Sequence, residues 1–511
     1  MTNAVPAMTI ARSIICAAAR SPGKLAICSS SRDLTYGELA SRIAQVAALA
    51  AEEAMLIGGD RVLLIAPNCP EYIEVVAGLS ASGAAVVTAN PMLSLPEIMR
   101  ILEDCQPKAI WIDPGLAETM EALADLGLPV FTTRGLDYEV RIARYHGAAL
   151  AELAQGEDCF CICYTSGTTG KPKGVMISHR SRVLTIHSMA AEYGCFGPDD
   201  HFLALTPLCH GAGFAFAVAP LLFGGTTSLA HDLRAPAILA RLAGGDITGM
   251  FIVPTHAKRF LELGQSAPTM VAGHRLKALI SNAAAMPQAN KRHLVDLFGE
   301  GLYHETYGST EGGIVTNIRP YDQLRKNSSV GTPFPNMEIQ LRDDGGNLVV
   351  GAGIGELFCR SPYVFSGYLG KSAETEAALN DGWLTVGDIA CRDEEGFYYI
   401  VDRKSDLIIS GGLNVYPKEI EQAAEAVPGL VEGAAVGLSD PEWGEAIHYF
   451  YVASGPDDIV PLLNDAFAAN LARYKRPKVL VCVDELPRSP AGKLMRNQLS
   501  RKVTLPGLAL L

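Results

Sequence analysis

Short apolar runs alternate with longer amphipathic segments through the first part of the chain. Runs of six or seven mostly apolar residues, typical of buried strands, are RVLLIAP (61–67), AAVVTA (84–89), KAIWID (108–113), MFIVPT (250–255) and LKALISN (276–282). Segments with helical spacing of apolar positions lie between the first of these runs, at 70–83 and 95–105. A strand–helix–strand order predicts parallel sheets with helices on their faces. We therefore expect an α/β fold with a large N-terminal domain of parallel sheets covered by helices.

The pattern changes after about residue 330. The segment 337–360 has short strand-like runs separated by glycines, which predicts hairpins or a small barrel-like subdomain. Further on, a strand, a glycine turn and a helix beginning after Pro417 predict a small α+β unit. We place the boundary at Asp402–Asp406, which gives an N-terminal domain of residues 1–402 and a C-terminal domain of residues 403–511.

Composition narrows the possible classes of protein. Of the 511 residues, 49% are hydrophobic and 19% are charged, against a usual charged share of about 25%. This composition predicts a large core. The net charge of −13 argues against bulk binding of nucleic acid, so that any phosphate site must be local.

Cellular location is predicted from segments that the sequence lacks. The longest apolar run, Phe214–Phe223, is interrupted by Pro220 and is too short to span a bilayer. The first residues lack the pattern of a secretory leader. Twelve scattered cysteines without metal-ligand spacing suit a reducing compartment. We expect a cytoplasmic protein without integral membrane association.

The segment YTSGTTGKPKGV, at 164–175, follows a strand-like run and combines glycines, hydroxyl side chains and lysines. Glycines let backbone N–H groups approach an anion closely, and such turns form concave anion sites. The glycine spacing differs from that of a Walker A loop, because Pro172 and Val175 stand where its second glycine belongs. The segment therefore predicts a phosphate-binding loop of another kind, although a flexible surface turn has the same composition.

Further patterns suit a nucleotide. In HETYGSTEGG (304–313), Tyr307 can stack on a base, Thr310 can hydrogen-bond a phosphate, and Glu311 can ligate Mg²⁺ through oxygen. Asp388, at the end of a predicted strand in WLTVGDIA (383–390), suits the two hydroxyls of a ribose, and Arg403 can contact the same nucleotide. Taken singly, each residue has an ordinary structural explanation, such as a core tyrosine or a surface ion pair.

In this order, the patterns resemble the adenylate-forming superfamily of acyl-CoA synthetases, luciferases and peptide-synthetase adenylation domains. The resemblance runs from DLTYGELASR (33–42) to SPAGKLMR (489–496), and the phosphate loop is its most specific element. It identifies the chain as similar to the carboxylate–CoA ligase branch. The resemblance implies Mg²⁺ as the cofactor, and ATP and coenzyme A as co-substrates.

The resemblance also assigns roles by position. It implies catalytic roles for Lys493, His210 and Glu311, with Glu311 as the Mg²⁺ ligand. The implied ATP and AMP contacts are Thr165, Ser166, Gly167, Thr168, Thr169, Lys173, Asn282, Ala283, Ala284, Ala285, Tyr307, Gly308, Thr310, Asp388 and Arg403. The implied CoA-binding turn is Ser410, Gly411 and Gly412, the implied acyl pocket is His210, Phe214 and Ala217, and the implied hinge is Ser405.

The implied chemistry has two steps. The carboxylate attacks the α-phosphorus of ATP, pyrophosphate leaves, and a thiol then attacks the acyl-adenylate and expels AMP. The resemblance implies that a mobile C-terminal domain brings Lys493 to the first step and the Gly411–Gly412 face to the second. Ser405 departs from the Asp or Lys of relatives, as do Ala285 from proline and Thr306 from glycine. The first departure concerns which residue acts as the hinge of the C-terminal domain. The other two concern the residues that contact the adenine.

The acid itself is predicted from CHGAGFAFAVA (209–219). This segment has no Asp to hold a substrate amine, and its apolar residues favour a fatty or aryl acid. A malonate- or oxalate-type dicarboxylate remains an alternative, because Arg259 stands where some malonate ligases carry an arginine. A non-catalytic homologue and a luciferase-like enzyme are further alternatives, and a homodimer is possible.

Overall fold

The computed structural model describes residues 7–150, 153–166, 172–410, 413–441, 443–455, 458–488, 494–496 and 498–499. The chain forms two compact units. The first is Met1–Ile339 with Cys359–Val386, and the second is Gln340–Phe358 with Gly387–Leu511. The boundary predicted at Asp402–Asp406 lies within the second unit and stays a prediction for the mobile C-terminal domain.

One sheet of the first unit has seven strands in the order β18-β8-β7-β4-β3-β5-β6. The strands are β3 (Arg61–Ile65), β4 (Ala85–Ala89), β5 (Ala109–Ile112), β6 (Val130–Thr132), β7 (Cys159–Ser166), β8 (Pro172–Ser178) and β18 (Gly367–Tyr368). The strands from β7 to β6 in this order pair in parallel, whereas β8 and β18 are antiparallel. The accompanying helices are α3 (Pro70–Ala81), α4 (Leu95–Cys105), α5 (Ala117–Ala124) and α6 (Leu136–Ala143). The predicted strands and helices of this region are confirmed.

The second sheet of this unit has nine strands in the order β15-β14-β13-β12-β11-β9-β10-β1-β2. They are β1 (Leu25–Cys28), β2 (Leu34–Thr35), β9 (His201–Ala204), β10 (Thr226–Leu229), β11 (Gly249–Ile252), β12 (Ala278–Ser281), β13 (Tyr303–Ser309), β14 (Gly313–Ile318) and β15 (Thr332–Pro333). The pairs from β13 to β1 are parallel. The strand predicted at 250–255 ends early, because Pro254 begins helix α10 (Pro254–Leu261).

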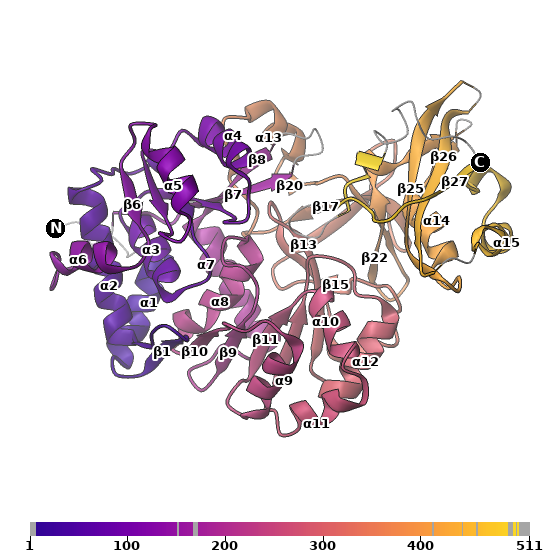
Figure 1. The fold of residues 1–511 in the computed structure, drawn as a ribbon. Helices are drawn as coiled ribbons and strands as arrows, with labels where there is room; N and C mark the ends of the chain where they lie inside the picture. The colour runs from indigo at the N-terminus through magenta and orange to yellow at the C-terminus, as the bar shows by residue number, and fades with distance from the viewer. Residues whose placement is uncertain are drawn as a thin grey trace. The chain divides into compact units, whose positions relative to one another are not determined.

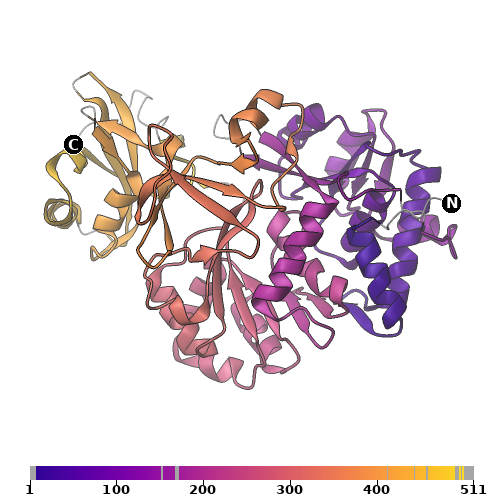
Figure 2. The same cartoon turned by 180° about the vertical axis from the view of Figure 1, so that it is seen from behind.

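Helices cover the nine-stranded sheet. Figure 1 shows α9 (Ala235–Ala243), α11 (Ala267–Val271) and α12 (Gln288–Phe298) near strand β11, and they share an apolar core with β9, β11 and β12. The indigo helices α1 (Ile10–Arg20) and α2 (Tyr36–Glu52) lie side by side in Figures 1 and 2. Helix α8 (Gly211–Phe223) is buried along most of its length, and its Phe216 stacks on Phe251 of β11 at 4.3 Å.

Local signals set where several helices begin. Helix α2 starts with a capping box, in which the Thr35 hydroxyl accepts from the Glu38 N–H and the Glu38 carboxylate accepts from the Thr35 N–H. Helix α4 starts with the same device at Ser94 and Glu97. These hydrogen bonds hold the pKa of both glutamates below the ordinary value.

The second unit contains two groups of strands. Strand β17 (Gly353–Arg360) runs from the second unit into the first, and its start pairs with β21 (Asp388–Arg392), which pairs with β22 (Tyr398–Arg403). A further sheet has the order β24-β23-β26-β25, with β27 beside β26. Its strands are β23 (Ile408–Ser410), β24 (Leu413–Val415), β25 (Leu430–Asp440), β26 (Gly444–Ala453) and β27 (Val479–Cys482), packed with α14 (Pro417–Ala424) and α15 (Val460–Asn470). The predicted α+β character and the helix after Pro417 are confirmed.

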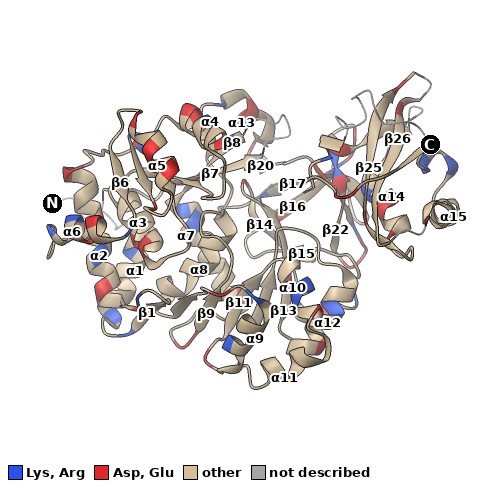
Figure 3. Ribbon diagram, in the orientation of Figure 1, with Lys and Arg blue, Asp and Glu red and all other residues tan. Residues whose placement is uncertain are grey.

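Charged residues are mixed over the outer helices, with acidic and basic positions interspersed on α2 and α12 (Figure 3). Within the described ranges, no helix combines the length and the apolar character needed to cross a bilayer. The absence of nucleic-acid binding remains a prediction.

Candidate active site

The strand order of the nine-stranded sheet reverses between β9 and β11. The chain runs from β9 to β10 on one side and from β11 through β12 to β13 on the other. In open α/β sheets, ligands bind outside the carboxyl ends of parallel strands at such a reversal. Three sequence-predicted residues lie at this edge, because His210 follows β9, Asn282 follows β12 and Tyr307 is near the end of β13.

The predicted phosphate loop joins β7 to β8. These strands form an antiparallel hairpin in which Thr165 pairs with Lys173. Lys173 forms an ion pair with Glu374 of α13 (Ser372–Ala378), and its ammonium lies 5.2 Å from the ring centre of Tyr368. Gly167, Thr168, Thr169 and the Ser166 side chain lie outside the described residues, so their phosphate contacts stay predictions.

Tyr368 connects this hairpin with the predicted Mg²⁺ ligand. Its backbone pairs with Val175 on β8, and its hydroxyl donates to Oε1 of Glu311 at 2.9 Å. The carbonyl of Glu311 accepts from the N–H of Phe365 at 2.7 Å. Lys173 and Glu311 thus both contact Tyr368, Lys173 near its ring and Glu311 at its hydroxyl.

The end of β13 has little space for side chains. A Cβ on Gly308 would lie 2.0 Å from the carbonyl oxygen of Gly313, so only glycine fits there. Tyr307 and Thr310 are partly exposed on either side of this glycine. Glycine at this position therefore keeps the backbone close to the neighbouring strand while Tyr307 and Thr310 remain accessible.

The predicted adenine-lining segment is exposed and held at both ends. The amide of Asn282 donates to the hydroxyl of Thr306 at 2.8 Å, and Ala283–Ala285 are exposed. Ala283 has a φ of 80°, a left-handed conformation that costs a non-glycine residue energy. The Met286 N–H then donates to Oε1 of Glu305 at 2.9 Å.

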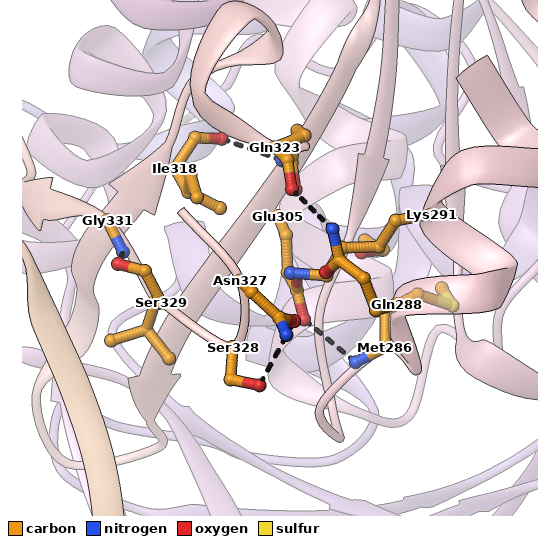
Figure 4. Close-up of polar contacts among 12 residues, drawn as sticks. Met286, Gln288, Lys291, Glu305, Ile318, Gln323, Asn327, Ser328, Ser329 and Gly331 are labelled. Carbon is orange, nitrogen blue, oxygen red and sulfur yellow. Dashed lines mark hydrogen bonds and ion pairs between the residues drawn. The ribbon is translucent and has the colours of Figure 1, made fainter. Parts of the chain in front are cut away.

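A buried ion pair supports that anchor. Lys291 of α12 pairs with Oε2 of Glu305 on β13, and their side chains are only 2% and 6% exposed. Figure 4 shows Lys291, Glu305 and Met286 close together, with Gln323 nearby. Gln323 donates to the carbonyls of Ile318 and Tyr303, at 3.0 and 3.2 Å. The exposed residues Ala283–Ala285 are therefore followed by a buried anchor, Met286, that is held by this polar network.

His210 is the N-cap residue of α8. Part of its ring is exposed, and its Nε2 lies 3.4 Å from the amide nitrogen of Asn90. Desolvation by the surrounding protein nevertheless lowers the pKa of His210, which keeps the imidazole neutral at pH 7.

The other predicted acyl-pocket residues are buried. Phe214 is 5% exposed and Ala217 is 0% exposed. The ring of Phe214 lies 5.7 Å from that of Phe160, in an aromatic cluster. His210 and Phe214 line one small cavity together, whereas Ala217 is not among its lining residues. Arg259, the basis of the dicarboxylate alternative, is exposed on α10.

The predicted ribose contacts are neighbours in the second unit. Asp388 pairs in register with Arg403, and their side chains form an ion pair of 3.1 Å. The expectation that Asp388 ends a strand is wrong. Strand β20 (Trp383–Leu384) stops earlier, Gly387 turns with a φ of 78°, and Asp388 begins β21.

Several predicted residues have no described geometry. Ser410 ends β23 and is 1% exposed, while Gly411, Gly412, Lys493 and the Ser405 side chain lie outside the described residues. The CoA turn, the mobile lysine and the hinge therefore stay predictions.

The sequence interpretation missed Tyr368, the Lys291–Glu305 pair and Arg182. Tyr368, Lys291 and Arg182 lie outside the quoted motifs, and Glu305 lies inside HETYGSTEGG but received no role there. An aligned set of relatives could single out such positions, whereas hydrophobic periodicity in one chain could not.

Comparison with known families identifies the class. The model of the AMP-binding enzyme family matches residues 16–369, and that of the AMP-binding enzyme C-terminal domain matches residues 419–493. The chain therefore belongs to the AMP-binding enzyme family, in its acyl-CoA ligase branch of AMP-forming acid–CoA ligases. The predicted family, fold class and enzyme class are confirmed.

Individual relatives differ in their acids. A long-chain-fatty-acid–CoA ligase of Escherichia coli O157:H7 is 33% identical, over 91% of this chain and 89% of its own length. An indoleacetate–CoA ligase of Aromatoleum aromaticum is 31% identical, over 94% and 96%. The structure of ATP-bound MatB from Rhodopseudomonas palustris superposes with a TM-score of 0.89 at 28% identity, covering 97% of this chain and 99% of that one. The family fixes the type of reaction, acid activation through an adenylate, but not the acid.

Proposed function

We propose that this AMP-forming ligase joins an apolar fatty or aryl carboxylic acid to coenzyme A. The observation that carries the proposal is that His210, Asn282 and Tyr307 lie at one edge of the sheet, with His210 at the start of the buried apolar helix α8. The relatives that act on a long-chain fatty acid and on indoleacetate support an apolar acid.

In the first step, the acid's carboxylate oxygen forms a bond to the α-phosphorus of ATP as the bond to pyrophosphate breaks. Asn282–Ala285 and Tyr307 hold the adenine, while Thr165 and Lys173 hold the phosphates. Lys493 stabilises the charge that builds up between the two anions. The ammonium of Lys173 pairs with Glu374 until phosphate replaces the carboxylate as its partner.

The donors present suit a magnesium ion. Mg²⁺ is typically bound by one or two protein carboxylates together with phosphates and water. Glu311 supplies one carboxylate, whose Oε1 is oriented by the hydroxyl of Tyr368. When bound, Mg²⁺ supplies charge neutralisation at the phosphates.

In the second step, the sulfur of CoA attacks the acyl carbonyl, the bond to AMP breaks, and the thiol proton passes to solvent. Ser410, Gly411 and Gly412 line the path of the pantetheine. Asp388 and Arg403 hold the ribose through both steps, and their ion pair keeps the two side chains oriented before the nucleotide binds.

A panel of acids incubated with ATP and CoA tests the proposal. We expect equal amounts of AMP, pyrophosphate and thioester, with the highest kcat/KM on medium-chain, long-chain or aryl acids. Stoichiometric ADP would contradict the adenylate route. A preference for malonate or oxalate over every apolar acid would establish the dicarboxylate alternative, and loss of that preference in Arg259→Leu would assign it to Arg259.

A further inference from the structure

Side chains of the seven-stranded sheet hold the loop between β9 and α8. Asn68, shortly after β3, donates to the carbonyl of Thr206 at 2.9 Å and accepts from the N–H of Leu208 at 2.8 Å. Thr88 of β4 donates its hydroxyl to the carbonyl of Cys209 at 2.9 Å. Because β3 and β4 are parallel neighbours, these hydrogen bonds come from one edge of that sheet. The backbone that leads into α8 is therefore fixed by a different sheet.

The next residue on the same face of the β4 segment, Asn90, contacts the ring of His210. Asn90 is 7% exposed, and its Oδ1 accepts from the N–H of Met92 at 2.9 Å. Since a backbone N–H can only donate, this contact fixes which end of the amide is the oxygen. The amide nitrogen then faces Nε2 of His210 at 3.4 Å. An amide NH₂ group donates and does not accept, so Nε2 is the acceptor.

An accepting Nε2 determines where His210 carries its proton. A ring nitrogen that accepts a hydrogen bond has no proton of its own, so the ring is neutral and its one proton is on Nδ1. Desolvation favours the same neutral state, because it lowers the pKa of His210. The ring makes no capping hydrogen bond to α8.

The groups that share a cavity with His210 are compatible with a neutral ring. The charged or titratable ones that line it are Cys161 and Cys163 of β7, Cys209, and Arg182 of α7 (His179–Tyr193). None of the described lining residues is a carboxylate, which would favour the imidazolium. The hydrogen bond with Cys161 lowers the pKa of Cys163 to about 7, so a thiolate at Cys163 is the anion to control for.

We propose that Asn90 is a positioning residue that holds His210 neutral with its proton on Nδ1. The ring then presents Nδ1–H as a hydrogen-bond donor to the acyl carbonyl oxygen, whose negative charge grows as the sulfur of CoA attacks. His210 keeps its proton throughout this step. The inference rests on the proposed function, because the acid beside His210 belongs to that proposal.

Nitrogen-15 NMR of protein labelled at histidine tests the tautomer without any assay of activity. Protonated and unprotonated ring nitrogens have well-separated shifts, and His210→Gln assigns the signals by their loss. We expect a proton on Nδ1 and none on Nε2 between about pH 6 and about pH 8. Cys163→Ala should leave this result unchanged.

Asn90→Asp should move the proton. The carboxylate keeps the size of the amide and still accepts from the Met92 N–H, but it offers Nε2 an acceptor in place of a donor. The proton should therefore shift to Nε2, and the pKa of His210 should rise. Asn68→Asp is the matched control, because the hydrogen bonds of Asn68 go to the backbone of the same loop. In that variant the proton should stay on Nδ1.

The pH dependence of thioester formation separates positioning from a structural role. With synthetic acyl-AMP and CoA at about pH 8, Asn90→Asp should lower kcat by on the order of 10², with little change in KM, because Nδ1 no longer donates. The loss relative to wild type should shrink toward about pH 6, since an imidazolium carries N–H on both nitrogens. A structural defect would give a loss that does not recover at lower pH.

Three results would overturn the proposal: a proton on Nε2 in the wild type, a tautomer that Asn90→Asp does not change, or a loss of kcat that is the same at every pH. If Asn90→Asp does not fold, Asn90→Leu replaces it, and its two ring nitrogens should share the proton. A wild-type enzyme that activates no acid would instead contradict the proposed function, and the NMR spectra would still decide the role of Asn90.

Discussion

Glu311 illustrates how single side chains at the site are held. The Tyr368 hydroxyl donates to its Oε1, and the Phe365 N–H donates to its carbonyl, so both its side chain and its backbone are oriented. The sequence motif predicted the carboxylate, whereas its orienting partner lies 57 residues away in the chain.

Glu311→Gln should abolish most adenylation while leaving the fold intact. A neutral amide is a poorer ligand for Mg²⁺ than a carboxylate, and it still accepts the hydrogen bond from Tyr368. Pyrophosphate release with ATP and acid measures the loss, which should be largest at limiting Mg²⁺. Circular dichroism provides the control for folding, and a normal rate at limiting Mg²⁺ would show that Glu311 is not a ligand.

At the scale of elements, α12 and β13 are joined by the buried Lys291–Glu305 pair beneath the segment 282–286. Removing one partner of such a pair leaves the other charge unpaired in the interior, whereas replacing both partners is often tolerated. The pair also positions the segment that is proposed to line the adenine, through the Met286 N–H.

Lys291→Met should therefore lower the free energy of unfolding by about 3–5 kcal/mol. The double variant Lys291→Met/Glu305→Gln should recover much of that loss, because it leaves no unpaired charge. Urea unfolding followed by circular dichroism measures both. Equal losses in the single and double variants would mean that packing around Lys291, and not its charge, stabilises the contact.

Elements of the first unit also bury neutral histidines. His179 of α7, His256 of α10 and His304 of β13 are 0%, 8% and 7% exposed, and desolvation lowers the pKa of each to about 4. In the unfolded chain these groups titrate near 6.5, so between pH 6.5 and 4 the unfolded state binds more protons.

The free energy of unfolding should consequently fall as the pH drops from about 6.5 to 4, by roughly 3 kcal/mol per histidine at the full shift. Glu74 opposes part of this change, since burial raises its pKa to about 7 and folding then favours its protonated form. Urea unfolding at several pH values measures the slope. His179→Phe, which keeps a ring beside Phe160, should reduce it. An unchanged slope would show that His179 does not contribute.

At the scale of the whole molecule, the expected reaction needs both units. Asp388 and Arg403 belong to the second unit, whereas Glu311 and His210 belong to the first. The resemblance to adenylate-forming enzymes implies that residues of the C-terminal part serve the two steps in turn.

Lys493→Ala should slow acyl-adenylate formation from acid and ATP by on the order of 10²–10³, the cost of losing one preorganised electrostatic donor. Given synthetic acyl-AMP and CoA, the same variant should form thioester at nearly the wild-type rate. Single-turnover assays of each half-reaction measure both. The converse variant, Gly412→Leu, should spare adenylation and block thioester formation. Equal slowing of both steps by Lys493→Ala would contradict the alternation of domains.

The sequence by itself determined the order of strands and helices, the family and the motif residues. It also determined the change, near residue 330, from alternating strands and helices to short strands separated by glycines. These features depend on periodicity and short motifs, which are properties of neighbouring positions. Asp388 shows the limit of such inference, because the turn at Gly387 moved it from the end of one strand to the start of the next.

Only the tertiary structure decided which distant residues meet. The order of strands in two sheets sets Tyr368 against Glu311 and Lys173, packs Lys291 against Glu305, and brings Arg182 of α7 to the carbonyl of Gly211 at the start of α8. These contacts join segments far apart in the chain. The free energy of a buried charge depends on the groups around it in space, and one sequence read along its length does not contain that arrangement.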